Sequence, residues 1–299
     1  MKLTIIYKIS ILFLLLIGIF SCKQKIDNPT HIITHEMGNS EVPIKPKRIV
    51  TLTTEATEAM LILGIKPVGR VKPNSYYLKN QVSKIEEVGY ENNVDIDKVS
   101  ALQPDLIFGT KSLHKEIYKK LSFLAPTIFV NNTNGNLKYN FIKYAESINK
   151  VYYGNQVLID YNNKLTKVKN IIKSNNLVNK KISFISFFPN KTYYLSKSTS
   201  IDSLLKELNL KQVKKNNSNN YINYIDLSKN DFLDIVKESN IIFYFTYDDK
   251  SKARQISWFS HPTINNLKLA TYQVNTDIHL SNGILTANII LSQLEINLI

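Results

Sequence analysis

Cysteine is nearly absent from this 299-residue sequence, in which Cys22 is the only one. A single thiol excludes a disulfide scaffold and any metal or cluster site that needs several cysteines. Five histidines argue against a histidine-rich metal site, and nine glycines and nine prolines are too few for a collagen-like or low-complexity chain. The residues that are present, 43% hydrophobic and 10% aromatic, suffice for a packed core and exclude a mainly disordered protein.

Arginine is also scarce, because the 38 basic residues include only Arg48, Arg70 and Arg254. The formal net charge of +14 is compatible with a nucleic acid, a membrane surface or an anionic ligand as partner. The lysines are spread along the chain, whereas a nucleic-acid binder usually gathers its basic residues on one element. We therefore interpret the charge as a solvated lysine surface and expect no nucleic-acid partner.

The N-terminus has the pattern of a secretory signal over residues 1–21. Lys2 and Lys8 give it a positive start, and residues 9–20 form an apolar run. The run is shorter than the ~20 apolar residues that a membrane-spanning helix needs. We therefore expect a cleaved targeting segment and not a transmembrane helix.

The signal ends in Ile19-Phe20-Ser21-Cys22, which resembles a bacterial lipobox. In that motif the cysteine is lipidated and becomes the mature N-terminus, and its acyl chains give stable membrane attachment. Phe20 is bulky for its position, and the alternative is an ordinary signal peptide with an incidental cysteine. We expect lipidation at Cys22, a short tether over residues 23–28, and an exported domain facing the periplasm or the exterior.

The mature chain begins with the order strand, helix, strand. Residues 48–52 form a short apolar run, residues 54–63 a helix that Gly64 ends, and residues 67–69 a second strand. This order is typical of a parallel α/β sheet. The same alternation of strand and helix patterns continues along the chain. It predicts further strands at 106–108, 127–130, 182–187, 241–245 and 272–274, and helices at 97–102, 115–124, 203–208, 232–237 and 283–294.

A long helical region is predicted over residues 139–173, with Gly154 dividing it. On its two sides, residues 99–110 and 232–246 repeat one layout of helix end, polar break, strand and threonine. The repeat indicates two similarly built lobes that the long helix joins.

Four stretches resemble the substrate-binding proteins of ABC transporters for ferric siderophores, haem and cobalamin. The resemblance extends over nearly all of the mature chain. The stretches that carry it are residues 46–69, Val88-Gly89 with 97–107, residues 121–127, and Trp258, His261-Pro262, Asn266-Leu267 and the final helix. The resemblance implies the helical-backbone (class III) periplasmic binding protein fold: α/β, with two Rossmann-like lobes with parallel-type sheets joined by one long rigid interlobe helix. We expect a signal peptide at 1–21, a tether and first strand region at 22–45, an N-terminal lobe at 46–138, a helical region at 139–176 and a C-terminal lobe at 177–299.

The resemblance further implies binding in the interlobe cleft without catalysis. The expected ligand is a ferric siderophore whose chelator holds the iron, so neither a cofactor nor a direct metal ligand is expected. Haem or cobalamin is the alternative within the family, and haem would need an axial ligand such as His279 or a tyrosine. An exported lipoprotein enzyme is the alternative from another class, although nucleophile-elbow, phosphate-loop and zinc motifs are absent from the sequence.

Candidate ligand residues follow from the rule that ligands bind at the carboxyl ends of parallel strands. Arginine offers a planar fork for carboxylates, and tyrosine and tryptophan offer flat apolar faces with a polar tip. The residues that we place in cleft loops are Arg70, Tyr76, Tyr90, Lys111, Tyr194, Arg254, Trp258 and His279, with Tyr77 and Tyr193 beside them.

The resemblance also implies docking to a permease through one acidic residue on each lobe. Glu116 matches the first position, and Asp248 or Asp249 lies near the second. Exposed charges at such places steer the encounter and fix its register more than they add affinity. The expected partners are the permease with its ATPase, a small iron chelate and the membrane, and we expect the protein to be a monomer.

Overall fold

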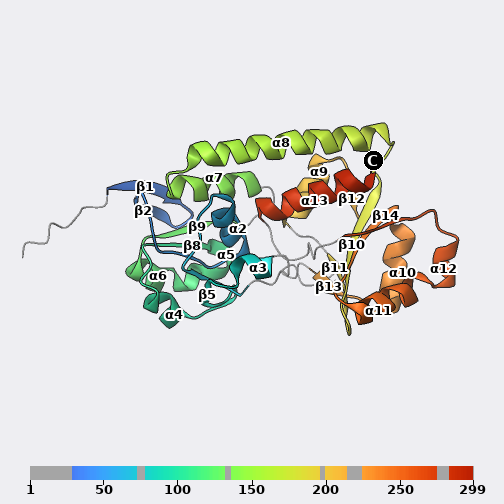
Figure 1. Ribbon diagram of the computed structural model, residues 1–299, viewed down its shortest axis with the longest axis horizontal. Helices are drawn as coiled ribbons and strands as arrows, with labels where there is room; N and C mark the ends of the chain where they lie inside the picture. Colours follow the sequence, from blue (N-terminus) through green and yellow to red (C-terminus); the bar gives the residue numbers. More distant parts are fainter. Residues whose placement is uncertain are drawn as a thin grey trace, which may run out of the picture.

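A computed structural model describes residues 29–72, 78–131, 136–195, 199–213, 224–274 and 283–298. The signal segment, Cys22, Tyr76 and His279 lie outside these ranges. Figure 1 shows two lobes side by side, with the 24-residue helix α8 (Val151–Ser174) lying along both. The predicted α/β architecture with a long interlobe helix is confirmed.

The N-terminal lobe is built around a parallel five-stranded sheet in the order β5-β4-β3-β8-β9. Its strands are β3 (Ile49–Thr51), β4 (Gly69–Arg70), β5 (Glu86–Glu87), β8 (Leu106–Thr110) and β9 (Thr127–Val130). Its helices are α2 (Thr54–Ile62), α3 (Lys79–Val82), α4 (Ile96–Ala101), α5 (Lys111–His114), the 3₁₀ turn η2 (Lys115–Ile117) and α6 (Tyr118–Leu124). Two hairpins flank the sheet: β1 (Thr30–His35) with β2 (Gly38–Pro43), and β6 (Gly89–Tyr90) with β7 (Asn93–Val94).

The C-terminal lobe has a mixed sheet in the order β13-β11-β10-β14-β15, with β12 also beside β10. Its strands are β10 (Lys181–Phe187), β11 (Thr192–Leu195), β12 (Lys211–Gln212), β13 (Tyr224–Asp226), β14 (Ile241–Thr246) and β15 (Ala270–Gln273). Its helices are α9 (Thr199–Glu207), α10 (Lys229–Glu238), α11 (Asp249–Phe259) and α12 (Pro262–Asn265). The strands β10, β12, β14 and β15 run parallel, but β11 and β13 are antiparallel to their neighbours, so the prediction of a parallel-type sheet holds only in part here.

The break in the long helical region does not fall at Gly154. Helix α7 (Leu137–Ser147) ends first, and α8 begins at Val151 after Asn149 adopts a left-handed backbone conformation with φ of 55°. Gly154 lies within α8, where an added Cβ would come within 2.8 Å of the Ala145 Cβ. The glycine therefore permits close packing of α7 against α8 and does not divide a helix.

The last helix, α13 (Ile284–Leu298), ties the two lobes together beneath α8 (Figure 1). It packs against α2 and α7 as well as α8 and α9. One apolar core accordingly runs from Phe108 and Tyr144, through Leu165 of α8, to Phe184 of the second lobe. This continuity makes the relative placement of the lobes part of the folded core.

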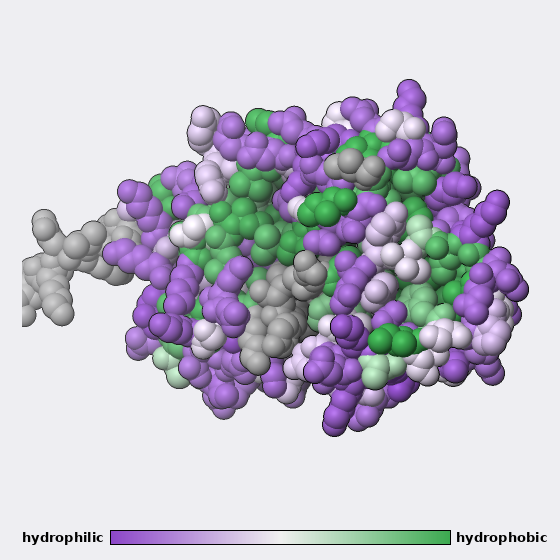
Figure 2. Space-filling view, turned by 45° about the vertical axis from the view of Figure 1, so that its right-hand side comes forward, coloured by the Kyte–Doolittle hydropathy of each residue, from purple (hydrophilic) through white to green (hydrophobic). Residues whose placement is uncertain are grey.

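On the face that Figure 2 shows, hydrophilic side chains surround hydrophobic areas on both lobes. Within the described part of the chain, no helix combines the length and apolar character that crossing a bilayer requires. Long α8 alternates apolar residues with lysine and asparagine, as a helix with one solvated face does.

Candidate functional site at the carboxyl ends of the strands

The C-terminal lobe gathers aromatic side chains where β10 and β14 end. Phe188 follows β10 and stacks on Tyr247, which follows β14, with ring centroids 5.7 Å apart. Tyr193 of β11 meets Phe188 edge to face at 5.6 Å. Tyr247 is 46% exposed, so this aromatic group presents a flat apolar face at the sheet edge where ligands of such folds bind.

Arg254 lies at the same edge and is held from two sides. Its guanidinium stacks on the Trp258 ring at 4.8 Å, one turn along α11, and its Nε donates to Thr192 Oγ1 at 2.9 Å. Thr192 pairs with Phe187 in the β10–β11 register, which fixes the arginine to the end of β10. The terminal guanidinium nitrogens make no hydrogen bond to the described residues. The site therefore offers an oriented cationic fork to a carboxylate or another anionic oxygen.

Helix α11 begins at this edge because Asp248 caps it. The Asp248 carboxylate accepts from the Ser251 backbone N–H at 2.8 Å, and the Ser251 hydroxyl accepts from the Asp248 backbone N–H at 2.7 Å. This reciprocal capping box satisfies two backbone donors and sets the direction of the helix that carries Arg254. Asp249 follows in the first turn and is exposed.

The N-terminal lobe presents Tyr90 and Lys111. Tyr90 is 50% exposed, and Lys72 Nζ lies 5.6 Å from its ring centroid. Lys111 begins α5 after β8, with its Nζ 3.8 Å from Glu36 Oε2. Both side chains are partly open to solvent, and both remain candidate ligand contacts. Glu116, the predicted docking residue, is exposed in η2.

Behind this edge, a buried histidine fixes the loop that follows Tyr90. His114 Nδ1 accepts from the Thr110 backbone N–H at 3.0 Å, and its Nε2 donates to the Glu91 carbonyl at 2.8 Å. Burial lowers the pKa of His114, so the ring is neutral in the tautomer that these bonds require. The Glu91 carboxylate in turn accepts from the Thr54 backbone N–H at 2.6 Å, at the start of α2. This histidine therefore has a structural role.

Arg70 does not face an open cleft in this structure. Its side chain is buried, and the guanidinium donates to the carbonyls of Val82 and Val71 and pairs with Glu87 at 3.0 Å. These bonds join β4 to α3 and β5. The arginine thus stabilises the edge of the sheet, and its fork is already occupied by the protein.

Tyr194 and Trp258 are core residues in the same way. Tyr194 is fully buried, and its hydroxyl donates to the Val213 carbonyl. Trp258 is 7% exposed and packs against Phe187 and Phe232 at centroid distances of 5.8 and 5.1 Å. Both rings are therefore enclosed within the lobe and are not exposed for ligand contact. Trp258 instead supports the Arg254 guanidinium, which can contact a ligand.

Sequence reasoning missed Phe188, Tyr247 and Thr192. The rule that nominated Lys111 applies equally to Phe188 and Tyr247, since each follows a buried strand directly. Thr192 carried no such signal, because its role depends on pairing with Phe187 across a hairpin.

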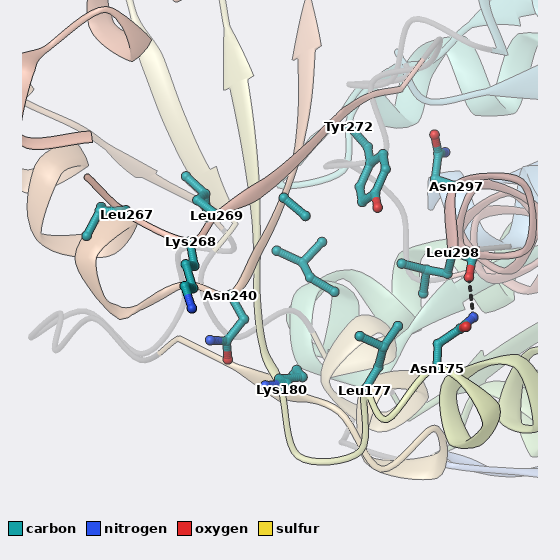
Figure 3. A pocket seen from close by; sticks show the side chains of 12 residues that line it. Asn175, Leu177, Lys180, Asn240, Leu267, Lys268, Leu269, Tyr272, Asn297 and Leu298 are labelled. Carbon is teal, nitrogen blue, oxygen red and sulfur yellow. Dashed lines mark hydrogen bonds between the residues drawn. The ribbon is translucent and has the colours of Figure 1, made fainter. Parts of the chain in front are cut away.

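A cavity of about 800 Å³ lies at the opposite edge of the C-terminal sheet (Figure 3). Figure 3 shows Lys180, Asn240 and Lys268 on one side and Leu298 and Asn175 on the other. Asn175 Nδ2 donates to the Leu298 carbonyl at 2.6 Å, joining the ends of α8 and α13. The cavity opens at the amino ends of β14 and β15, away from Arg254. Across the described residues, no group of three or more His, Cys, Asp or Glu side chains could hold a metal ion.

Comparison with known proteins agrees with this geometry over most of the chain. The periplasmic binding protein family matches residues 49–267. The probable siderophore-binding lipoprotein YfiY of Bacillus subtilis is 33% identical over 288 residues, covering 89% of this chain and 87% of YfiY. Staphylococcus aureus SirA in complex with staphyloferrin B has a TM-score of 0.69 at 25% identity, covering 90% of this chain and 98% of SirA. The iron-uptake system-binding protein FeuA of B. subtilis has a TM-score of 0.74 at 19% identity, covering 90% of this chain and 100% of FeuA.

Two α/β lobes under one long helix, with a cationic and aromatic group at the strand ends, define a two-lobed binding protein. The chain belongs to the periplasmic binding protein family.

Proposed function

We propose that this chain is the lipid-anchored substrate-binding component of an ABC importer and that it captures an anionic ferric siderophore. The observation that carries the proposal is Arg254, a guanidinium oriented by Trp258 and Thr192 at the sheet end where the exposed aromatic group also lies. The names of YfiY and of SirA with staphyloferrin B support the same ligand class.

The mechanism is binding without catalysis. The chelator holds the iron, and the Arg254 fork pairs with anionic oxygens of the complex. Phe188, Tyr193 and Tyr247 contribute flat apolar surface against the organic part of the ligand, and Tyr90 with Lys111 contact it from the other lobe. The shared core through α8 and α13 fixes the relative placement of the lobes, which reduces the cost of ordering on binding.

The ligand class is tested by titrating the lipid-free domain and following Trp258 fluorescence. The ligands are ferric citrate, a ferric hydroxamate, a ferric catecholate, haemin and cobalamin. Saturable quenching by one ferric siderophore class is the expected result. Tight haemin binding with a shifted Soret band, or cobalamin binding in its place, would contradict the siderophore proposal.

We also propose that Glu116 and Asp249 dock the permease. Asp248 is occupied as the cap of α11, which leaves the exposed Asp249 as the acidic group of the second lobe. Glu116→Ala and Asp249→Ala are expected to reduce iron uptake by cells and to leave ligand affinity unchanged, because exposed charges set encounter and register. A large loss of affinity in either variant would place that residue in the ligand site.

The anchor is proposed at Cys22, in keeping with relatives that are named lipoproteins. Cys22→Ala is expected to move the protein out of the membrane fraction. Retention of the variant in that fraction would contradict lipid anchoring. The segment boundaries and the monomeric state given above also stay proposals, and gel filtration of the lipid-free domain tests the second.

A further inference from the structure

Glu55 is a buried carboxyl group that, among the described residues, has one hydrogen-bond donor and no basic partner. It lies in the first turn of α2 and is 6% exposed. Asn140 of α7 donates from Nδ2 to Glu55 Oε1 at 3.1 Å. The second oxygen, Oε2, is buried and has no hydrogen-bond partner among the described residues.

Asn140, like Glu55, has one acceptor oxygen that lacks a hydrogen-bond donor among the described residues. It is buried, and its Nδ2 also donates to the Asn131 carbonyl at 3.0 Å, so both amide hydrogens are used. Its Oδ1 is buried and has no partner among the described residues. Exchanging the positions of Oδ1 and Nδ2 does not solve this, because an oxygen at the Nδ2 position cannot donate to Glu55 Oε1 or to the Asn131 carbonyl.

Two groups already joined by one hydrogen bond thus each keep an acceptor without a donor. A buried acceptor that lacks its donor costs free energy, and native structures avoid it. One proton on Oε2 gives the missing donor, because a carboxylic acid can donate to the Asn140 Oδ1 while Oε1 still accepts from Nδ2. We propose that Glu55 is protonated at neutral pH and that its acid forms a doubly hydrogen-bonded pair with the Asn140 amide.

The charges around Glu55 favour the same state. The ionisable groups that act on it are Glu58 on its own helix and Glu91 from the β6–β7 turn, both acidic, and Tyr144 on α7 is buried as well. Burial is the largest cause that raises the pKa of Glu55, to about 8, with Glu58 and Glu91 adding to it and the Asn140 hydrogen bond opposing it. Within the described part of the chain, a negative charge on Glu55 would face two further carboxylates and no cation.

The pair has a consequence at the ligand edge. Asn131 directly follows β9, and Asn140 holds its carbonyl while bonded to Glu55. Ionisation of Glu55 removes the donor to Oδ1 and sets two oxygens against each other. The link between α2 and the β9–α7 connection therefore weakens as the pH rises through about 8.

The direct test is a ¹³C NMR titration of the intact lipid-free protein, labelled at the glutamate side-chain carboxyl carbon. We expect one resonance to titrate near pH 8 and to be missing from the Glu55→Gln variant. Titration of every glutamate near the ordinary pKa of about 4.3 would overturn the proposal, and the wild-type spectrum alone decides this.

A second test compares melting temperatures between pH 5 and pH 9. Glutamine reproduces the protonated acid, donating to Oδ1 and accepting from Nδ2, so Glu55→Gln is expected to gain over wild type as the pH rises. Exposed Glu86→Gln is the matched control and is expected to follow wild type. If sodium, potassium or calcium chloride stabilises wild type at pH 7 but not Glu55→Gln, the oxygens hold a cation and the proton proposal is overturned.

Discussion

Glu58 caps the last helix of the chain across 228 residues of sequence. Its carboxylate accepts from the Thr286 backbone N–H at 3.1 Å and from the Thr286 hydroxyl at 2.9 Å. Glu58 is fully buried on α2 of the N-terminal lobe, and Thr286 lies in the first turn of α13. A carboxylate at a helix N-terminus satisfies free backbone donors and complements the helix dipole, so this contact attaches α13 to the first lobe.

Removing that carboxylate should destabilise the whole protein. Glu58→Ala leaves the Thr286 N–H and hydroxyl without this acceptor and opens a small void, which together should cost about 2–4 kcal/mol of unfolding free energy. Urea denaturation measures the change, with exposed Glu86→Ala as the control. Equal stability of the two variants would show that the Glu58 cap contributes little.

The Glu58 carboxylate leaves no room for a side chain at position 283, so this residue is a glycine. A Cβ at this position would overlap the Glu58 carboxylate, so Gly283→Ala should destabilise the protein. In Glu58→Ala the obstructing group is gone, so the second substitution should cost less there than in wild type. A double-mutant cycle by urea denaturation measures this coupling, and strict additivity would argue against the contact.

Acid should weaken the β1–β2 hairpin through His35. Its Nδ1 accepts from the backbone N–H groups of Phe129 and Met37, and its Nε2 is 2.9 Å from the Ser40 hydroxyl. Burial, with the Lys143 charge as a smaller cause, lowers the pKa of His35 from 6.5 to about 4. The unfolded chain takes up the proton first, so stability is lost as the pH falls from 6.5 towards 4.

Urea midpoints between pH 7 and pH 4 measure this loss, and His35→Gln should show a shallower decline than wild type. His261→Gln is the control, because His261 caps the short helix α12 far from the hairpin. An identical decline in wild type and His35→Gln would show that protonation of His35 does not cause the loss of stability in acid.

Trp258 should report ligand without contacting it. Because the ring is packed in the core, its folded emission should be blue-shifted and poorly quenched by iodide. Trp258→Phe keeps an aromatic face beneath Arg254 and should leave siderophore affinity within about twofold by calorimetry. A large loss of affinity in this variant would mean that the indole touches the ligand.

The strand and helix order could be read from the sequence because buried strands such as Leu106–Thr110 are continuous apolar runs between turn residues. Strand β11 was not predicted, although Pro189-Asn190 between two apolar runs is a hairpin signal that predicts an antiparallel partner for β10. The first hairpin was also missed, because residues 22–45 were assigned only as a tether and first strand region; the positive φ of Gly38 marks its turn. Gly154 shows that a glycine can indicate close packing as well as a helix end.

The site was harder to predict than the fold, because strand ends can be located in a sequence but side-chain directions cannot. Arg70 and Arg254 both follow the rule for strand ends, yet the first points into the sheet edge and the second lies on α11 against the Trp258 ring. The Arg254 contact with Trp258 spans four residues of helix and was recognisable as a neighbouring pair. The hydrogen bond from Arg254 to Thr192 joins residues 62 positions apart and could be recognised only in the structure.

The central claim, that Arg254 binds an anionic ferric siderophore, is tested most directly by comparing two variants of α11. Calorimetric titration of Arg254→Gln with the siderophore that wild type binds should show an affinity about 10- to 100-fold weaker, as loss of a charge-assisted contact predicts. Lys252→Gln removes an exposed charge from the same helix and should bind as wild type does. Wild-type affinity in Arg254→Gln, or an equal loss in Lys252→Gln, would contradict the account.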